Sequence, residues 1–298
     1  MLVNALLLVL SVFAASTAVI MIKASTLPPV LLASLRLFVA SLVLLPLFVR
    51  DLRRHRDTYT TAHLQASVLP GLVLAVHLMT WIVGARMTPT ANASLIVNLV
   101  PLAMPFFLVW LANEALTRRE IAATGVALTG VVILTATDLN LSSAYFAGDL
   151  ICLGSMLFYA LYLALGRRNR HHPTVWLYLV PLYAVAAVTS MVVFVLMATP
   201  LLPAGSDDLA REVALVLGLG IVPTVIGHSL LNRSMKYFRG QLVSLVNMGQ
   251  FVFAGAMAFL LWREVPAATF YLAATMLLAA AWIVVRSGRE GRWVRRLS

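Results

Sequence analysis

The strongest constraint on this chain is a series of long apolar runs that charged residues hardly interrupt. Each run is about 20 residues long, which is the length that a helix needs to cross the hydrocarbon core of a bilayer. Strands of a membrane barrel would instead alternate polar and apolar residues over about 10 positions. The sequence therefore predicts an all-α fold, an integral membrane bundle of ten transmembrane helices. The predicted spans are residues 2–22, 29–49, 65–85, 91–112, 119–137, 146–166, 173–198, 213–234, 240–262 and 267–286.

Composition supports this class and excludes others. Charged residues make up 11% of the chain, against about 25% in soluble proteins, and apolar residues make up 61%. So little polar surface cannot cover a globule of this size in water, which excludes an ordinary soluble enzyme. The net charge of +11 would suggest nucleic acid in a soluble protein. Here the basic residues stand between the spans rather than on one face among aromatic side chains, so we expect no nucleic-acid partner.

Lysine and arginine are distributed unevenly between the two sides of the spans. Seventeen fall on the side that holds both ends of the chain, and four fall on the other side. Because cytoplasmic loops carry the excess of positive charge, we predict that both termini are cytoplasmic and that the protein lies in a bacterial inner membrane. Residues 287–298 form a basic cytoplasmic tail in this prediction, which either anchors the orientation or binds anionic lipid headgroups.

The chain contains an internal repeat. Ser244 and Glu264 follow Ser94 and Glu114 by 150 residues, and the segments between them are similar in sequence. Each copy holds five spans, an odd number, so the second copy must be inverted in the membrane relative to the first. The sequence predicts two inverted five-helix repeats, with a boundary near the polar stretch 139–146. The predicted ranges are 1–138 for the first repeat and 146–286 for the second.

Two stretches resemble a known family. Lys23 and Pro29, followed by Ala33 and Arg36, look like the first hairpin of the drug/metabolite transporter superfamily in its ten-helix EamA-type branch. Residues 93–130 resemble the best-known stretch of that branch, a proline-bearing helix that ends at a glutamate and is followed by a glycine-rich helix. The resemblance implies a secondary transporter of a small organic metabolite, an amino acid or a related compound. It also implies alternating access, with export as the direction.

Polar residues at membrane depth are the candidate substrate ligands. Each costs a few kcal/mol there unless it faces a cavity or a partner. His77 shares a helix face with Trp81, and His228, which follows His77 by 151 residues, shares one with Asn232. Pseudo-symmetry is expected to bring these faces to one central cavity. The predicted substrate-binding residues are His77, Trp81, Asn98, Tyr159, Tyr162, His228, Asn232, Asn247 and Gln250.

Several of these polar residues also have a structural interpretation. Asn98 is either hydrogen-bonding glue between helices or part of the pocket, and the histidines and tyrosines could be satisfied core residues. Glu114 and Glu264 lie at span ends beside Arg118 and Arg263, and are expected to cap helices and hold short loops. Arg36 lies inside a span and has no counterpart in the second copy. It is either paired or directed into the cavity as the counter-charge of an anion.

The sequence lacks the motifs of intramembrane or nucleotide chemistry. It has no phosphate-binding glycine loop, no HExxH and no GxSxG. The chain has a single cysteine, Cys152, so it can form neither an internal disulfide nor a metal site made of several cysteines. We therefore predict no enzyme activity, no cofactor and no metal. The expected partners are a small-molecule substrate and membrane lipids, with protons as a candidate coupling ion through a histidine.

Other functions stay open at this stage. A lipid-linked sugar flippase would show a groove open to lipid. A non-transporting membrane scaffold or a lipid-modifying enzyme would have intramembrane polar residues that pair with one another rather than line a void. A monomer and a homodimer are both compatible with the sequence.

Overall fold

The computed structural model describes residues 2–88, 90–138, 144–198, 200, 208–262 and 268–294. Within these ranges the chain is helical and contains no strand. The helices are α1 Leu2–Ser16, α2 Ala18–Ala24, α3 Pro29–Arg54, α4 Thr61–Gln65, α5 Val68–Met87, α6 Thr90–Val97, α7 Val100–Ala112, α8 Arg118–Asp138, α9 Phe146–Arg168, α10 Val175–Leu196, α11 Leu209–Leu219, the π-helix η1 Gly220–His228, α12 Ser229–Ser234, α13 Gly240–Asn247, α14 Gln250–Trp262 and α15 Ala268–Val294.

The helices follow the predicted spans closely. In the described ranges, seven helical segments are long and apolar enough to cross a membrane. The fifth, ninth and tenth predicted spans correspond to α8, to α13 with α14, and to α15. The all-helical membrane bundle is therefore confirmed. The predicted linker at 139–146 lies mostly outside the described residues.

Two of the predicted spans are broken rather than continuous. The fourth divides where α6 ends at Val97 and α7 begins at Val100, and the ninth divides where α13 ends at Asn247 and α14 begins at Gln250. The two breaks are 150 residues apart, as the repeat requires. The breaks lie beside residues that weaken a helix, because Pro101 cannot donate a backbone hydrogen bond and Gly249 is a poor helix former.

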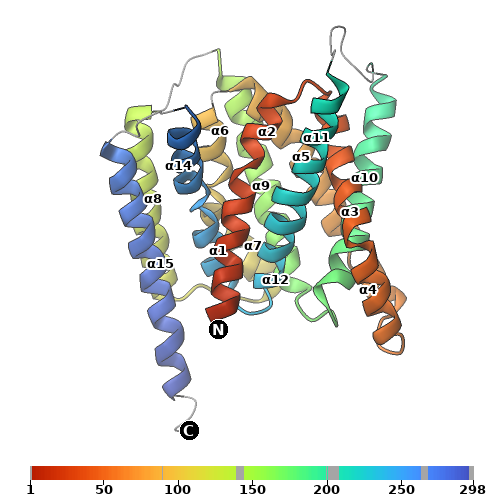
Figure 1. Cartoon of the computed structure of the whole chain (residues 1–298). Helices are drawn as coiled ribbons and strands as arrows, with labels where there is room; N and C mark the ends of the chain where they lie inside the picture. The colour runs from red at the N-terminus through yellow and green to blue at the C-terminus, as the bar shows by residue number, and fades with distance from the viewer. Residues whose placement is uncertain are drawn as a thin grey trace.

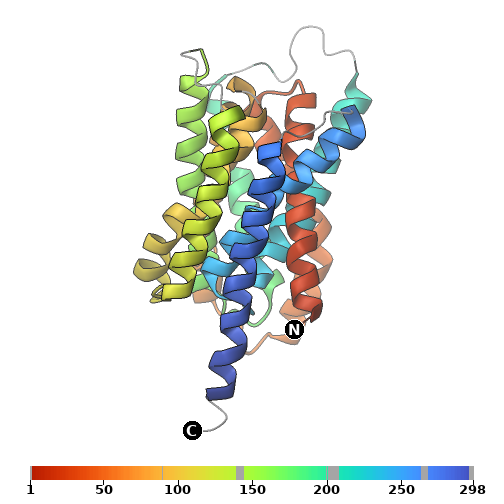
Figure 2. The ribbon, with the colours of Figure 1, turned by 90° about the vertical axis from the view of Figure 1, so that its left-hand side faces the viewer.

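The helix of the last predicted span continues into the predicted basic tail. We expected a tail from residue 287, but α15 continues to Val294. The helix has no need to stop where the apolar run stops, because arginine is a good helix former in water. Figure 1 shows α15 projecting beyond the bundle at the end where α1 begins. Figures 1 and 2 both show α15 beside α8, the last helix of the first repeat.

Close helix packing holds the centre of the bundle together. A Cβ on Gly84 of α5 would come within 2.7 Å of the Cys152 sulfur on α9, and a Cβ on Gly148 of α9 would come within 2.8 Å of the Met87 backbone. Small residues allow such approaches between helices in lipid, where packing rather than water drives association. The seam between α5 and α9 joins the two repeats beside the cavity described next.

Candidate functional site

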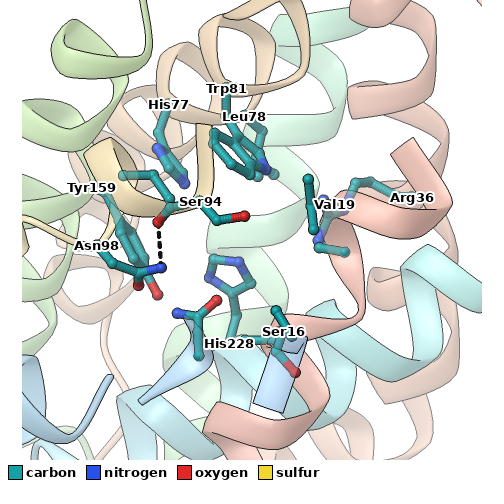
Figure 3. Close-up of a pocket in the computed structure, with 15 residues that line it drawn as sticks. Ser16, Val19, Arg36, His77, Leu78, Trp81, Ser94, Asn98, Tyr159 and His228 are labelled. Atoms are coloured by element: carbon teal, nitrogen blue, oxygen red, sulfur yellow. Dashed lines mark hydrogen bonds between the residues drawn. The ribbon is translucent and has the colours of Figure 1, made fainter. Parts of the chain in front are cut away.

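A buried pocket lies between the two repeats (Figure 3). Helices α1, α2, α3, α5, α6, α9 and α14 and the π-helix η1 line it, together with the break between α6 and α7. Six of the nine predicted substrate-binding residues line the pocket: His77, Trp81, Asn98, Tyr159, His228 and Gln250. Apolar contacts come from Val19, Leu78 and Val97, and further polar groups come from Ser16, Ser94 and Arg36.

Aromatic rings and histidines form one wall. The rings of His77 and Tyr159 stack, with centroids 4.6 Å apart and planes 9° from parallel. The ring of His228 lies 6.4 Å from that of His77, so the two histidines matched across the repeat do meet. The His77 Nδ1 lies 3.0 Å from the Ser155 carbonyl oxygen. A carbonyl can only accept, so Nδ1 carries the proton and Nε2 of the neutral ring is left as an acceptor.

Three of the predicted ligands lie behind this wall. The Asn232 amide donates to the Tyr162 hydroxyl at 2.6 Å. Asn247 Oδ1 accepts from the Gln250 amide at 2.9 Å and from the Tyr159 hydroxyl at 3.4 Å. These three residues, Tyr162, Asn232 and Asn247, support the lining side chains, and direct contact with a substrate stays a prediction for them.

Several polar atoms around the pocket have no partner. Asn98 donates to the Ser94 carbonyl of its own helix at 2.6 Å, but its Oδ1 is buried and accepts no hydrogen bond. His228 Nδ1 and Arg36 Nη1 are buried without a partner as well. Unsatisfied buried groups are rare in proteins because each loses its hydration. The described hydrogen bond of Asn98 goes to Ser94 rather than to another span, and the unpartnered atoms of Asn98, His228 and Arg36 are candidate ligand contacts.

Arg36 was not among the predicted ligands. It extends from α3 with a side chain that is 1% exposed, and its Nε and Nη2 donate to the Thr224 hydroxyl at 3.0 and 2.8 Å. The signal was present in the sequence as an unmatched arginine inside an apolar run. The sequence alone could not decide between a paired and a cavity-facing side chain, because the answer depends on what η1 places opposite it.

The pocket is narrow and contains no acidic side chain among its lining residues. Its volume of about 40 Å³ has room for a few water molecules, but not for a metabolite. In the described residues, no group of three or more histidine, cysteine, aspartate or glutamate side chains is placed to hold a metal ion. The chemistry available is thus stacking, hydrogen bonding and one guanidinium charge.

Polar contacts between the repeats close the bundle at the end near the termini. The Arg167 guanidinium on α9 pairs with Glu114 at 2.7 Å, and Arg239 pairs with Glu120 at 2.5 Å. Glu114 has the expected structural role of a helix cap, but the helix that it caps is α13 rather than the next helix, α8. Glu114 accepts instead from the backbone N–H of Gly240, the first residue of α13, at 2.8 Å. Glu264 and Arg263 lie outside the described residues.

A carboxylate also joins the two repeats at the opposite end of the bundle. Glu212 on α11 accepts from the Ser25 hydroxyl at 2.6 Å and from the Thr26 backbone N–H at 2.7 Å. Ser25 and Thr26 lie in the loop between α2 and α3, so this contact also joins the second repeat to the first. In Figure 1 this loop lies at the end of the bundle opposite α12. The pocket therefore lies between inter-repeat contacts at both ends of the bundle.

His172, which lies outside the membrane-spanning segments, has a shifted pKa. Burial in the loop between α9 and α10 lowers the pKa of His172. Its Nδ1 and Nε2 lie 2.9 and 3.1 Å from the carbonyl oxygens of Asn169 and His63. Lys236 donates to the His172 carbonyl from the α12–α13 connection. Desolvation outweighs the two carbonyl contacts, so the neutral imidazole is favoured.

Comparison with known proteins identifies the chain's relatives. The family model described as "EamA-like transporter family" matches it twice, over residues 2–136 and 146–286. A solved structure described only as "Crystal structure of protein" shares 20% sequence identity with it, with a TM-score of 0.75. That match covers 96% of this chain and 98% of the other. At this identity the likeness shows the fold alone. No curated protein matches the chain.

Proposed function

Because the chain belongs to the EamA-like transporter family, we propose that it is a secondary transporter that moves a small organic metabolite by alternating access. The family and the apolar helices make it a multi-pass membrane protein that carries small molecules. The substrate class that we propose is an amino acid or a related compound. Export across a bacterial inner membrane is the proposed direction.

The observation that supports this function most is the pocket at the interface of the repeats. The two helix breaks, 150 residues apart, both border it, because Asn98 and Gln250 are lining residues. Broken helices at the midplane, between inverted repeats, are typical of the substrate sites of secondary transporters. The unpartnered polar atoms of Asn98, His228 and Arg36 argue against a scaffold, in which intramembrane polar groups would satisfy one another.

The small volume of the pocket supports alternating access. A metabolite does not fit into about 40 Å³, so the repeats must move apart for it to enter. Contacts of Glu114 with Arg167 at one end, and of Glu212 with Ser25 at the other, hold the repeats together. If the contacts at one end break while those at the other end are kept, the pocket opens to one side of the membrane only.

The proposed orientation places both termini, and with them the Glu114 contact, in the cytoplasm. A membrane-impermeant maleimide applied to intact cells should label Ser206→Cys, between α10 and α11, in a Cys152→Ala background. It should leave Asp57→Cys, between α3 and α4, unlabelled until the cells are permeabilised. The reverse pattern would contradict the orientation.

The function itself is tested by uptake into proteoliposomes. The purified protein is assayed against a panel of radiolabelled amino acids and organic acids, with and without a pH gradient. Saturable uptake of at least one of these solutes, absent from protein-free liposomes, is expected. If no solute is taken up while extracts of membrane lipid are translocated between leaflets, a lipid flippase becomes the better interpretation. The buried lining of the pocket favours a small soluble solute instead.

A further inference from the structure

Resting on the proposed transport function, we infer that the substrate is an organic monoanion, a planar or aromatic carboxylate without an α-ammonium group. Its carboxylate would lie on Arg36, and its body would lie against the ring faces of Trp81, His77 and Tyr159. Within the proposed class of amino acids and related compounds, this inference selects acids whose carboxylate charge is not balanced by an ammonium group in the same molecule. Arg36, its surroundings and the far side of the pocket each support this assignment.

The guanidinium of Arg36 is buried but only partly used. Arg36 is a lining residue of the pocket: its Nε and Nη2 donate to the Thr224 hydroxyl, and its Nη1 is buried without a hydrogen-bond partner. The Thr224 hydroxyl donates in turn to the Leu219 carbonyl five residues earlier, at 2.7 Å. That hydrogen bond fixes the oxygen as an acceptor for Arg36 within the π-helix. The arginine is thus held in place while one N–H₂ group stays free to bind a ligand.

No negative charge compensates Arg36 in the part of the chain that the structure describes. Within the described residues its hydrogen bonds go to a neutral hydroxyl, no ion pair includes it, and no lining residue of the pocket is acidic. An arginine is always charged, and burying a charge without an opposite one is costly. A carboxylate matches the planar fork of the guanidinium and supplies the missing charge.

The other side of the pocket suits a neutral group. Figure 3 shows Arg36 beside Val19, with Asn98 and Tyr159 on the opposite side and His228 and Trp81 between them. The free Oδ1 of Asn98 and Nδ1 of His228 can hydrogen-bond a hydroxyl or an amide. An α-ammonium would lie next to the carboxylate, close to Arg36, where no carboxylate receives it. A zwitterion therefore fits less well than the acid that lacks the amino group.

The test uses four probes that share one phenyl body: 3-phenylpropionate, its neutral amide 3-phenylpropionamide, zwitterionic L-phenylalanine and cationic 2-phenylethylamine. Binding to the full-length protein in nanodiscs is measured by titration calorimetry. The variants are Arg36→Gln, Arg36→Lys and the control Arg53→Gln, an exposed arginine on the same helix. Because the wild-type protein alone ranks the four probes, the test does not depend on the folding of a variant.

We expect 3-phenylpropionate to bind at least tenfold more tightly than the other three probes. Arg36→Gln should abolish this preference, Arg36→Lys should retain part of it, and Arg53→Gln should leave it unchanged. Equal binding of the acid and the amide, tighter binding of L-phenylalanine, or no binding of any probe would overturn the assignment. If the proteoliposome panel still shows uptake in that case, the transport function stands and only the substrate class falls. If the panel also fails, both fall.

Discussion

Arg167 and Glu114 belong to different repeats, yet their side chains meet at 2.7 Å and are only 12% and 7% exposed. The same arginine donates to the backbone carbonyls of Met235 and Phe238, and the same glutamate accepts from the Gly240 N–H. One ion pair thus connects the end of α7, the end of α9 and the connection between α12 and α13. Its loss should loosen the bundle at this end while leaving the Glu212 contact at the other end intact.

Glu114→Gln should favour the state that is open at the end near the termini. The substitution removes the charge that Arg167 pairs with, and breaking a buried pair costs about 3–5 kcal/mol, less where a partner is partly exposed. Labelling of a pocket cysteine, Ser16→Cys in a Cys152→Ala background, should become faster by several fold from that end. Asp57→Asn, an exposed carboxylate at the same end, is the control and should have no effect. Unchanged labelling in Glu114→Gln would mean that this pair does not close the pocket.

Gly148→Ala should destabilise the protein by about 1–3 kcal/mol, the usual cost of overpacking. A Cβ there would lie 2.8 Å from the Met87 backbone, which cannot turn aside as a side chain can. Gly154→Ala on the same helix meets nothing within 4 Å and is the matched control. The melting temperature in detergent should fall for the first variant and stay level or rise for the second, since alanine favours helix. Equal melting temperatures would contradict close packing of α5 on α9.

Trp81→Ala should lower transport by about tenfold, because it removes a stacking surface that contributes about 0.5–1.5 kcal/mol beyond the apolar contact itself. Trp81→Phe keeps an aromatic face and should retain most of the activity. Trp110 on α7 is 67% exposed, so Trp110→Ala is the matched control and should transport normally. If Trp81→Ala keeps its activity but melts at a lower temperature, Trp81 is a packing residue.

His228→Gln should bind substrate but lose the dependence of uptake on an imposed pH gradient. Its Nδ1 is unpartnered beside the pocket, whereas His77 is held by Ser155. A glutamine keeps hydrogen bonding but cannot take up a proton. Binding and uptake must be measured separately, with His77→Gln and the double variant in parallel. Wild-type pH dependence in all three variants would leave an uncoupled facilitator or exchanger as the better mechanism.

His172 should make the folded protein less stable in mild acid. Because its pKa is lowered by burial, the unfolded chain binds a proton more readily than the folded chain does. Neutral His172 makes its full contribution to the free energy of unfolding above about pH 6.5, the ordinary pKa of histidine. The contribution decreases as the pH falls below that value. When the pH is lowered from about 7.5 to about 5.5, the melting temperature should therefore decrease less in His172→Gln than in the wild-type protein. An equal or larger loss would contradict the shift.

Much of the fold followed from the sequence because apolar length is a local property. The apolar runs and the repeat were enough to predict the spans and the approach of His77 to His228. None of these predictions required knowing which side chains pair with which. Mean hydropathy does not register the helix breaks, although Pro101 marks the first of them in the sequence because it cannot donate a backbone hydrogen bond. The Arg167 partner of Glu114 escaped because the two residues are distant in sequence and meet only when the loops fold. Arg36 was visible in the sequence, but its neutral partner Thr224 depends on the π-helix.

The burial of Arg36 without an acidic partner has an electrical consequence. If the empty carrier reorients around this side chain, a positive charge changes its position within the membrane field. Moving one elementary charge across the whole field is worth about 2.3 kcal/mol per 100 mV, and a shorter path is worth a proportional fraction. With a carboxylate bound, the pair is neutral and the loaded carrier is indifferent to voltage. The membrane potential would then act on the return of the empty carrier rather than on the passage of its cargo.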